Sequence, residues 1–181
     1  MTDRLQERSG RFAFVVLLAI LGAITTAQDA PLEYPVKAAY LYNFVKYVEW
    51  PDGGDGTVLI CVAGQNPFGT QLDTLVKNER VRGKPLATET ILEPKPECDV
   101  LFIPKTSTMT AYLKASAGKP VLTVGEIPRF VELGGIVNFV TDNSNRVRFE
   151  INRHAADRVG LRISSRLLQL ATIVDPAGES R

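Results

Sequence analysis

Three short apolar runs alternate with segments of helical character, and this alternation limits the possible folds more than any other feature of the chain. The runs are TVLICVAG, CDVLFIP and PVLTVG, at positions 57–64, 98–104 and 120–125. Continuous apolar runs of this length are typical of strands that are covered on both faces. Buried strands that alternate with helices predict a mostly parallel sheet with helices packed against it.

The remaining segments fit the same scheme. A helix is predicted early in the chain, where Pro35 suits the first turn and Trp50-Pro51 ends the helical pattern. Two further helices are predicted at 67–78 and 107–118, and a further strand at 84–92. The opening helix carries aromatic side chains all around its circumference, which is typical of a helix with one side in the core and another in an interface.

The pattern changes after Gly134, where two strands flank Asp142-Asn143-Ser144-Asn145 and predict a β-hairpin. Asn152 then caps a helix that runs to Arg158, Gly160 breaks it, and Ser164 or Ser165 caps the next helix. The apolar residues of this last segment are expected on its buried side: Leu161, Ile163, Leu167, Leu168 and Leu170. The predicted fold class is α/β, a three-layer sandwich of a mostly parallel β-sheet flanked by helices, with a C-terminal β-hairpin.

The first 27 residues have the pattern of a secretory signal peptide. Three arginines precede the apolar run at 12–24, and small residues follow it. The run is shorter than the roughly 20 residues that a membrane span needs. We expect cleavage after Ala27, with Thr25 two positions before it, which leaves residues 28–181 as a single exported domain; an uncleaved anchor is the alternative.

The charge balance excludes one class of partner. The chain has 21 basic and 20 acidic residues, and removal of the signal peptide leaves a net charge near zero. Phosphate binding needs a basic excess, so we expect no nucleic-acid partner.

Cys61 and Cys98 are the two cysteines of the chain. An even number of cysteines in an oxidising compartment suggests a disulfide. The alternative is a pair of buried free thiols in neighbouring strands. A redox-active pair is not expected, because the CxxC spacing that lowers a thiol pKa is missing.

Motifs for enzyme chemistry are missing from the sequence. The segment GQNPFGT at 64–70 resembles a phosphate loop, but Thr70 stands where a P-loop lysine would follow and Pro67 removes a backbone donor. No GxSxG or HExxH motif is present, and His154 is the only histidine. We therefore predict neither catalysis, nor a metal site, nor a cofactor.

Four charged residues near the C-terminus leave two interpretations open. Arg158, Arg162 and Arg166 are spaced by four and are divided between two elements, so they form either a solvated basic edge or part of a pocket. In the second interpretation, Glu150 on its strand joins Arg158 and Arg162 to hold a zwitterion or an anion through charge-assisted hydrogen bonds. Such a site binds rather than reacts, since arginine does not exchange protons near neutral pH.

Five segments, taken in order, resemble the YfiR-like family of exported bacterial proteins. They are EYPVKAAYLYNFVKYVEWP, ICVAGQNPFG, CDVLFIP, VLTVGEIPRFVELGGIVNFV and RVRFEINRHAADRVGLRISSRLLQLA. The resemblance covers the chain from Glu33 to Val174. It implies a periplasmic regulator that represses a membrane-bound diguanylate cyclase by binding the periplasmic sensor domain of that enzyme. It also implies that an outer-membrane lipoprotein relieves this repression.

The resemblance also implies roles for particular residues. Family members form homodimers and carry disulfides, and Cys61 and Cys98 match the positions of one bridge, whereas a second bridge near the hairpin is missing. Glu150, Arg158 and Arg162 match the region that the family uses for small ligands. The proposed partner or dimer face is the aromatic side of the first helix, with Tyr40, Tyr42, Tyr47 and Trp50. The alternative function is a periplasmic small-ligand-binding sensor or adaptor.

Overall fold

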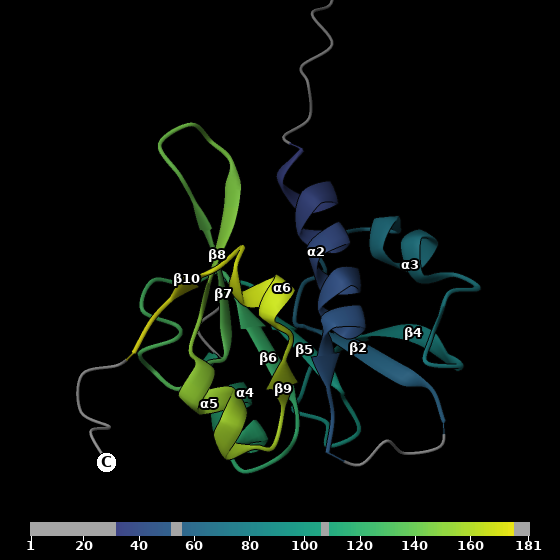
Figure 1. Cartoon of the computed structure of the whole chain (residues 1–181). Coiled ribbons are helices and arrows are strands. Elements are labelled where there is room, and N and C mark those ends of the chain that lie inside the picture. The colour runs from purple at the N-terminus through teal and green to yellow at the C-terminus, as the bar shows by residue number, and fades with distance from the viewer. Residues whose placement is uncertain (1–31, 52–55, 106–108, 176–181) are drawn as a thin grey trace, which may run out of the picture. The chain divides into compact units, whose positions relative to one another are not determined.

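An eight-stranded sheet organises the computed structural model, which describes residues 32–51, 56–105 and 109–175 (Figure 1). The strand order is β10-β8-β7-β6-β5-β2-β4-β3, and a separate two-stranded sheet pairs β1 with β9. The strands are β1 Val48–Glu49, β2 Val58–Ala63, β3 Arg80–Val81, β4 Lys84–Ile91, β5 Val100–Ile103, β6 Leu122–Gly125, β7 Val137–Thr141, β8 Val147–Ile151, β9 Arg162–Ile163 and β10 Thr172–Ile173. The helices are α2 Glu33–Tyr47, α3 Gln71–Val76, α4 Met109–Ser116, α5 Arg153–Arg158 and α6 Ser165–Leu168.

The middle of the sheet is parallel, as the apolar runs predict. Strands β4, β2, β5, β6 and β7 run in one direction. β8 returns antiparallel to β7 as the predicted hairpin, and β3 is antiparallel to β4. The predicted fold class is therefore confirmed: a mostly parallel α/β sheet is flanked by helices on its two faces.

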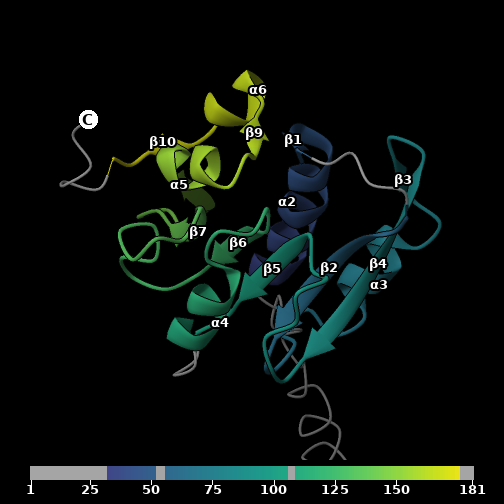
Figure 2. The same cartoon turned by 90° about the horizontal axis from the view of Figure 1, so that it is seen from below.

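Alternate residues of the central strands serve two different cores. Ile60 and Val62 of β2 belong to the core that α2 and α3 cover, whereas Cys61 and Ala63 belong to the core that α4 covers. Figure 2 shows α2 and α4 on opposite sides of the sheet. Because successive side chains of a strand point to opposite faces, a fully apolar run satisfies both cores at once.

Aromatic rings dominate the core beneath α2. Phe44 is fully buried, and its ring centroid lies 5.3 Å from that of Phe149 and 5.8 Å from that of Phe139. On the same side of the sheet, Phe68 meets Phe102 edge to face at 4.9 Å. The contacts of Phe44 join α2 to β7 and β8, and the contact of Phe68 joins the loop after β2 to β5.

On the opposite face, the ring of Phe130 lies between two glycines. A Cβ atom added at Gly125 would lie 2.5 Å from this ring, and one added at Gly135 would lie 2.1 Å from it. Both distances are too short for any side chain, so the loop between β6 and β7 can pack against the sheet only with glycine at these positions.

Lys37 anchors the start of α2 to the end of β6. Its side chain is 4% exposed, and its Nζ lies 2.5 Å from carboxylate oxygens of both Glu33 and Glu126. Glu126, which directly follows β6, also accepts a 3.3 Å hydrogen bond from the Tyr34 hydroxyl. Burial alone would lower the pKa of Lys37, but the hydrogen bonds to Glu126 and Glu33 outweigh burial and raise it.

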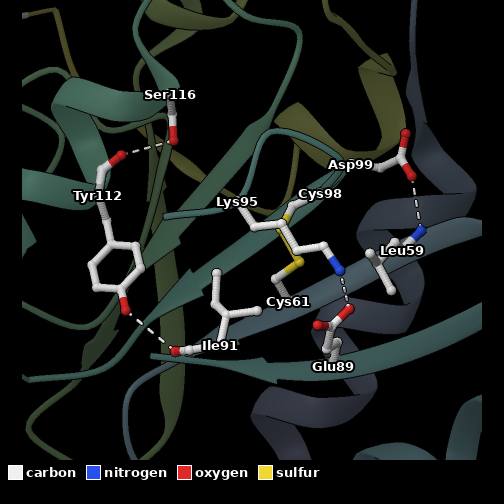
Figure 3. Close-up of a disulfide and its surroundings, with 9 residues drawn as sticks. All are labelled: Leu59, Cys61, Glu89, Ile91, Lys95, Cys98, Asp99, Tyr112 and Ser116. Carbon is white, nitrogen blue, oxygen red and sulfur yellow. Dashed lines mark hydrogen bonds and ion pairs between the residues drawn. A yellow bond between two sulfur atoms is a disulfide. The ribbon is translucent and has the colours of Figure 1, made fainter. Parts of the chain in front are cut away.

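The disulfide between Cys61 and Cys98 fastens β2 to the segment that leads into β5 (Figure 3). Both residues are buried, and their Cα atoms lie 5.8 Å apart. Beside the bridge, the Asp99 carboxylate accepts a 2.8 Å hydrogen bond from the backbone N–H of Leu59. The prediction of a bridge is confirmed, and the free-thiol alternative is excluded.

Several predicted boundaries were wrong. The first helix ends at Tyr47 rather than at Trp50, because Val48–Glu49 leave the helix to pair with β9. The helix predicted at 67–78 is reduced to α3, because Asn66 holds the preceding residues in a turn through hydrogen bonds with Phe68 and Gly69.

The caps of the last two helices agree with the sequence. The Asn152 side chain accepts from the N–H of Ala155, and the Ser164 side chain accepts from the N–H of Leu167. The predicted signal peptide, 1–27, lies outside the described residues. Within the described residues, no helix is both long and apolar enough to cross a membrane.

We predict that Lys37→Met destabilises the fold by about 3–5 kcal/mol, because Glu126 is left buried without its cation. Chemical unfolding monitored by circular dichroism measures the change. The matched control is Lys95→Met at the exposed pair with Glu89, which should cost less than about 1 kcal/mol. Equal effects of the two substitutions would contradict the anchoring role.

The raised pKa of Lys37 fixes the sign of the pH dependence. The stabilisation is fully present below the pKa of an unfolded lysine and is lost as the pH rises through the higher folded value. The difference in stability between wild type and Lys37→Met should therefore persist through neutral pH and shrink only at strongly alkaline pH.

We predict that the double variant Cys61→Ala/Cys98→Ala is about 4 kcal/mol less stable to urea, because the bridge closes a loop between residues 37 positions apart. Reduced wild-type protein should unfold at nearly the same midpoint as the double variant. An unchanged midpoint in both samples would show that the bridge contributes nothing to stability.

Candidate functional site

An apolar hollow lies where α2 meets the segment around α6. It has a volume of about 370 Å³ and is lined by Tyr40, Asn43, Tyr47, Arg166, Leu167 and Leu170. We call these six residues the α2–α6 surface. In Figure 1, α6 lies beside the lower half of α2, and contacts between the two helices agree with that view.

The helical spacing of α2 builds one side of this surface. Tyr40, Asn43 and Tyr47 follow one another at intervals of three and four residues, so they share one face of the helix. Val36, one turn earlier on the same face, is 39% exposed. The exposed apolar face therefore continues from the hollow toward the start of the helix.

Leu170 builds the opposite side. It lies two residues after the end of α6 and is 68% exposed, whereas Leu167 within α6 is buried. The expectation that Leu170 belongs to the buried side was wrong, because α6 is only one turn long and the chain turns away from the core after Leu168. Leu170 thus joins the surface instead of the core.

The four aromatic residues predicted for an interface have different environments. Tyr40 and Tyr47 line the hollow of the α2–α6 surface, and Tyr47 is 36% exposed. Tyr42 lies elsewhere on the helix, and its hydroxyl donates a hydrogen bond to Glu79. Trp50 packs partly against the core, and its indole N–H is buried without an acceptor among the described residues.

The predicted ligand set lies on three separate elements. Glu150 is on β8, where it accepts a 3.5 Å hydrogen bond from the Asn138 side chain. Arg158 ends α5 and lines a cavity beside α4, and that cavity has neither Glu150 nor Arg162 in its lining. Arg162 is exposed on β9 in register with Glu49. The role of the set in ligand binding stays a prediction.

His154 lies at the surface, and the loop GQNPFGT at 64–70 packs against the core. His154 is exposed on α5, and its Nε2 lies 3.1 Å from a carboxylate oxygen of Asp175. The loop forms a turn between β2 and α3, and it buries Phe68 in the core. Among the described residues, no group of three or more histidines, cysteines or acidic residues is placed to hold a metal ion.

The geometry of the α2–α6 surface suits contact rather than chemistry. Tyrosine and leucine side chains supply apolar contact area. Tyr47, Asn43 and Arg166 add polar groups to the lining, and the Asn43 amide donates a hydrogen bond to the carbonyl of Ala39 within α2. Exposed aromatic and apolar residues beside a hollow, with an arginine at the rim, are typical of a protein-binding surface.

The sequence contains only part of the signal for this surface. The aromatic residues of α2 were found because their number exceeds what one buried helix face needs. The exposure of Val36 and Leu170 was not predicted. An apolar residue in a periodic segment gives the same sequence pattern whether its side chain is buried in the core or exposed beside it.

Two solved structures are similar to parts of the chain. One is an ABC domain from Streptococcus pneumoniae in complex with L-Trp, with 12% identity and a TM-score of 0.46, over 65% of this chain and 55% of that one. The other is a conserved domain protein from Vibrio cholerae O1 biovar El Tor, with 17% identity and a TM-score of 0.46, over 77% of this chain and 59% of that one. The chain thus spans less than two thirds of the length of either structure.

A comparison with curated proteins finds no match. The family comparison does: the family described as YfiR/HmsC-like matches residues 34–172, which run from the first turn of α2 to the first residue of β10. This match contains all the described helices from α3 onward, nearly all of α2 and the whole of the α2–α6 surface. The chain is a member of the YfiR/HmsC-like family.

Proposed function

We propose that this protein is an exported, non-catalytic regulator that represses a membrane-bound diguanylate cyclase by binding its periplasmic domain. The observation that carries the proposal is the family match over residues 34–172. Repression of this kind lowers cyclic-di-GMP and with it biofilm formation. The proposal includes the periplasm as the compartment in which the protein acts, and an outer-membrane lipoprotein as the partner that releases the cyclase.

Two features of the chain support this compartment. The basic and apolar pattern at 1–27 is that of a signal peptide. The disulfide between Cys61 and Cys98 is typical of proteins that fold in an oxidising environment.

We assign the contact with the cyclase to the α2–α6 surface. A regulator without catalytic chemistry acts through its contacts, and this surface combines an exposed tyrosine, an exposed leucine and an arginine around a hollow. Tyrosine and arginine are over-represented among the residues that dominate binding energy at interfaces. Tyr40 supports the surface from beneath, since its ring lies 5.2 Å from that of Phe149 in the core.

We predict that Tyr47→Glu and Leu170→Glu each weaken binding to the periplasmic domain of the cyclase by about 30-fold or more, because a carboxylate would be buried in an apolar contact. The matched control is Leu92→Glu, since Leu92 is 84% exposed at the far end of β4. Surface plasmon resonance with the isolated periplasmic domain measures the affinities.

The same variants have a readout in cells. Deletion of the gene should raise cyclic-di-GMP, the wild-type gene and Leu92→Glu should restore the low level, and Tyr47→Glu and Leu170→Glu should fail to restore it. Unchanged cyclic-di-GMP after deletion would exclude a cyclase as the target. Normal binding by both surface variants would instead exclude the α2–α6 surface and leave the target intact.

The homodimer that the family resemblance implies is tested with the same proteins. Sedimentation velocity of wild type, Tyr47→Glu and Leu170→Glu separates the two possible uses of the surface. If both variants become monomeric while wild type is a dimer, the surface joins two copies of this chain, and the assignment of the cyclase contact to it is wrong.

A further inference from the structure

The outer side of β4 is an open edge of the eight-stranded sheet. β4 pairs with β2 on one side over residues 86–91, whereas β3 covers the other side only at Lys84 and Pro85. One further hydrogen bond runs from the N–H of Leu86 to the carbonyl of Glu79. Beyond Leu86, no strand among the described residues lies against this side of β4. Figure 2 shows β4 outside β2, on the side of the sheet away from β6.

The hydrogen bonds at the two ends of β4 identify the backbone groups on the open side. Successive residues of a paired strand direct their N–H and C=O groups to alternate sides. The N–H of Leu86 points outward, to the segment before β3, and the carbonyl of Ile91 points inward, where it accepts from the N–H of Gly64 just after β2. The N–H and C=O groups of Thr88 and Thr90 therefore point outward. Within the described residues, no backbone hydrogen bond uses these outward groups.

This edge lacks the features that usually keep another strand away. Those features are prolines, β-bulges and unpaired charges. The proline of β4 is Pro85, in the stretch that β3 covers, and the pairing of β4 with β2 is continuous. The open stretch at 87–91 has one charged residue, Glu89, and its Oε2 lies 2.6 Å from Nζ of Lys95 (Figure 3). The edge is therefore free to pair with another strand.

A second copy of this chain matches the open stretch when it lies antiparallel. With Glu89 of both copies at the two-fold axis, Thr88 of each copy lies opposite Thr90 of the other, and each such pair exchanges both of its N–H to C=O hydrogen bonds. β3 lies against β4 only before this stretch begins. After Ile91 the chain bends away from the line of β4 and returns to Cys98 beside β2. Neither segment thus lies between the two strands.

We propose that two copies of the chain join through the open edge of β4, antiparallel about Glu89, into one continuous sheet. Each copy uses the same edge, so the contact closes on itself. Pairing of β4 with the opposite edge of the sheet, at β10, would leave two outer edges free and could continue into a filament. The α2–α6 surface contains no residue of β4, so the proposal goes beyond the proposed function and does not require the cyclase.

Sedimentation velocity of the purified protein tests the proposal with two double variants. Thr88→Pro/Thr90→Pro removes the outward N–H groups and keeps the pairing with β2, because proline is tolerated on an edge strand where its N–H would face solvent. Thr88→Ala/Thr90→Ala is the matched control, since it removes the same side chains and keeps the N–H groups. We expect wild type and the alanine variant to dimerise alike, and the proline variant to dimerise about 100-fold or more weakly.

Three results of this experiment overturn the proposal: a wild type that stays monomeric at the highest concentration, a proline variant that dimerises like wild type, and an alanine variant as monomeric as the proline variant. Circular dichroism checks the fold of each variant. If the proline variant does not fold, amide hydrogen exchange of wild type decides. The amides of Thr88 and Thr90 should be protected at high protein concentration and exchange rapidly on dilution. Exchange that does not depend on concentration overturns the proposal.

The charges at the axis give an independent readout. The two Glu89 side chains face each other in the proposed pairing, and Lys95 compensates each of them. Like charges directly opposite each other destabilise paired strands. Lys95→Gln should therefore weaken the dimer about two- to fivefold, and Glu89→Gln in the same chain should restore the wild-type affinity. An unchanged affinity in Lys95→Gln, or no restoration in the double variant, overturns the pairing about Glu89.

The variants of the α2–α6 surface separate this contact from the one proposed for the cyclase. Tyr47→Glu and Leu170→Glu should remain dimeric, and so should Leu92→Glu, which lies beyond the end of β4. Monomeric Tyr47→Glu and Leu170→Glu beside a dimeric proline variant would place the dimer contact on the α2–α6 surface and overturn the proposal. Failure of the protein to bind a cyclase leaves all of these expectations unchanged.

Discussion

The ion pair between Lys37 and Glu126 is the constraint on which the arrangement of the C-terminal elements depends. It joins the first turn of α2 to the end of β6, across 89 positions of sequence and in a buried environment. Two buried charges stabilise a structure only where their geometry is good and their remaining hydrogen bonds are made. Here Tyr34 and Glu33 supply two of those bonds. The pair therefore sets the direction in which α2 crosses the sheet.

The direction of α2 determines where β1, β9 and α6 lie. α2 continues into β1, β1 pairs with β9, and β9 leads within one residue into the cap of α6. The α2–α6 surface is thus built from residues more than 100 positions apart that are held together by a two-stranded sheet. A protein that acts through contact needs such a rigid arrangement, because ordering a mobile surface at the moment of binding costs affinity.

The strands and turns that were predicted correctly are those whose structure follows from a short stretch of neighbouring residues. Fully apolar runs identified β2, β5 and β6, and turn residues around Asp142 identified the hairpin of β7 and β8. Strands β1, β3, β9 and β10 could not be predicted, since each has two residues and exists only because a partner strand lies beside it. The contact of Lys37 with Glu126 could not be predicted from the sequence either, because a lysine in an amphipathic helix normally points to water.

The same reasoning applies to the positions of the predicted site residues. Tyr40 and Tyr47 were predicted because a helix needs only one aromatic face for its core, and a surplus must go elsewhere. The place of Leu170 depends on where a one-turn helix ends, and that is decided by the pairing of β9 with β1. Of the charged residues that line the cavity beside α4, only Arg158 was predicted as part of a site, because the lining comes from elements that are separate in the sequence.

The position of β10 has a consequence for how the chain becomes a folded domain. β10 is the last element of the described residues and forms the edge of the sheet beside β8, where the N–H of Val174 also donates to the carbonyl of Ile151. Until β10 is paired, the backbone of β8 presents open hydrogen-bonding groups, which can pair with a strand of another molecule. The domain is therefore most exposed to self-association while β10 has not yet docked on β8, and its docking closes that edge of β8.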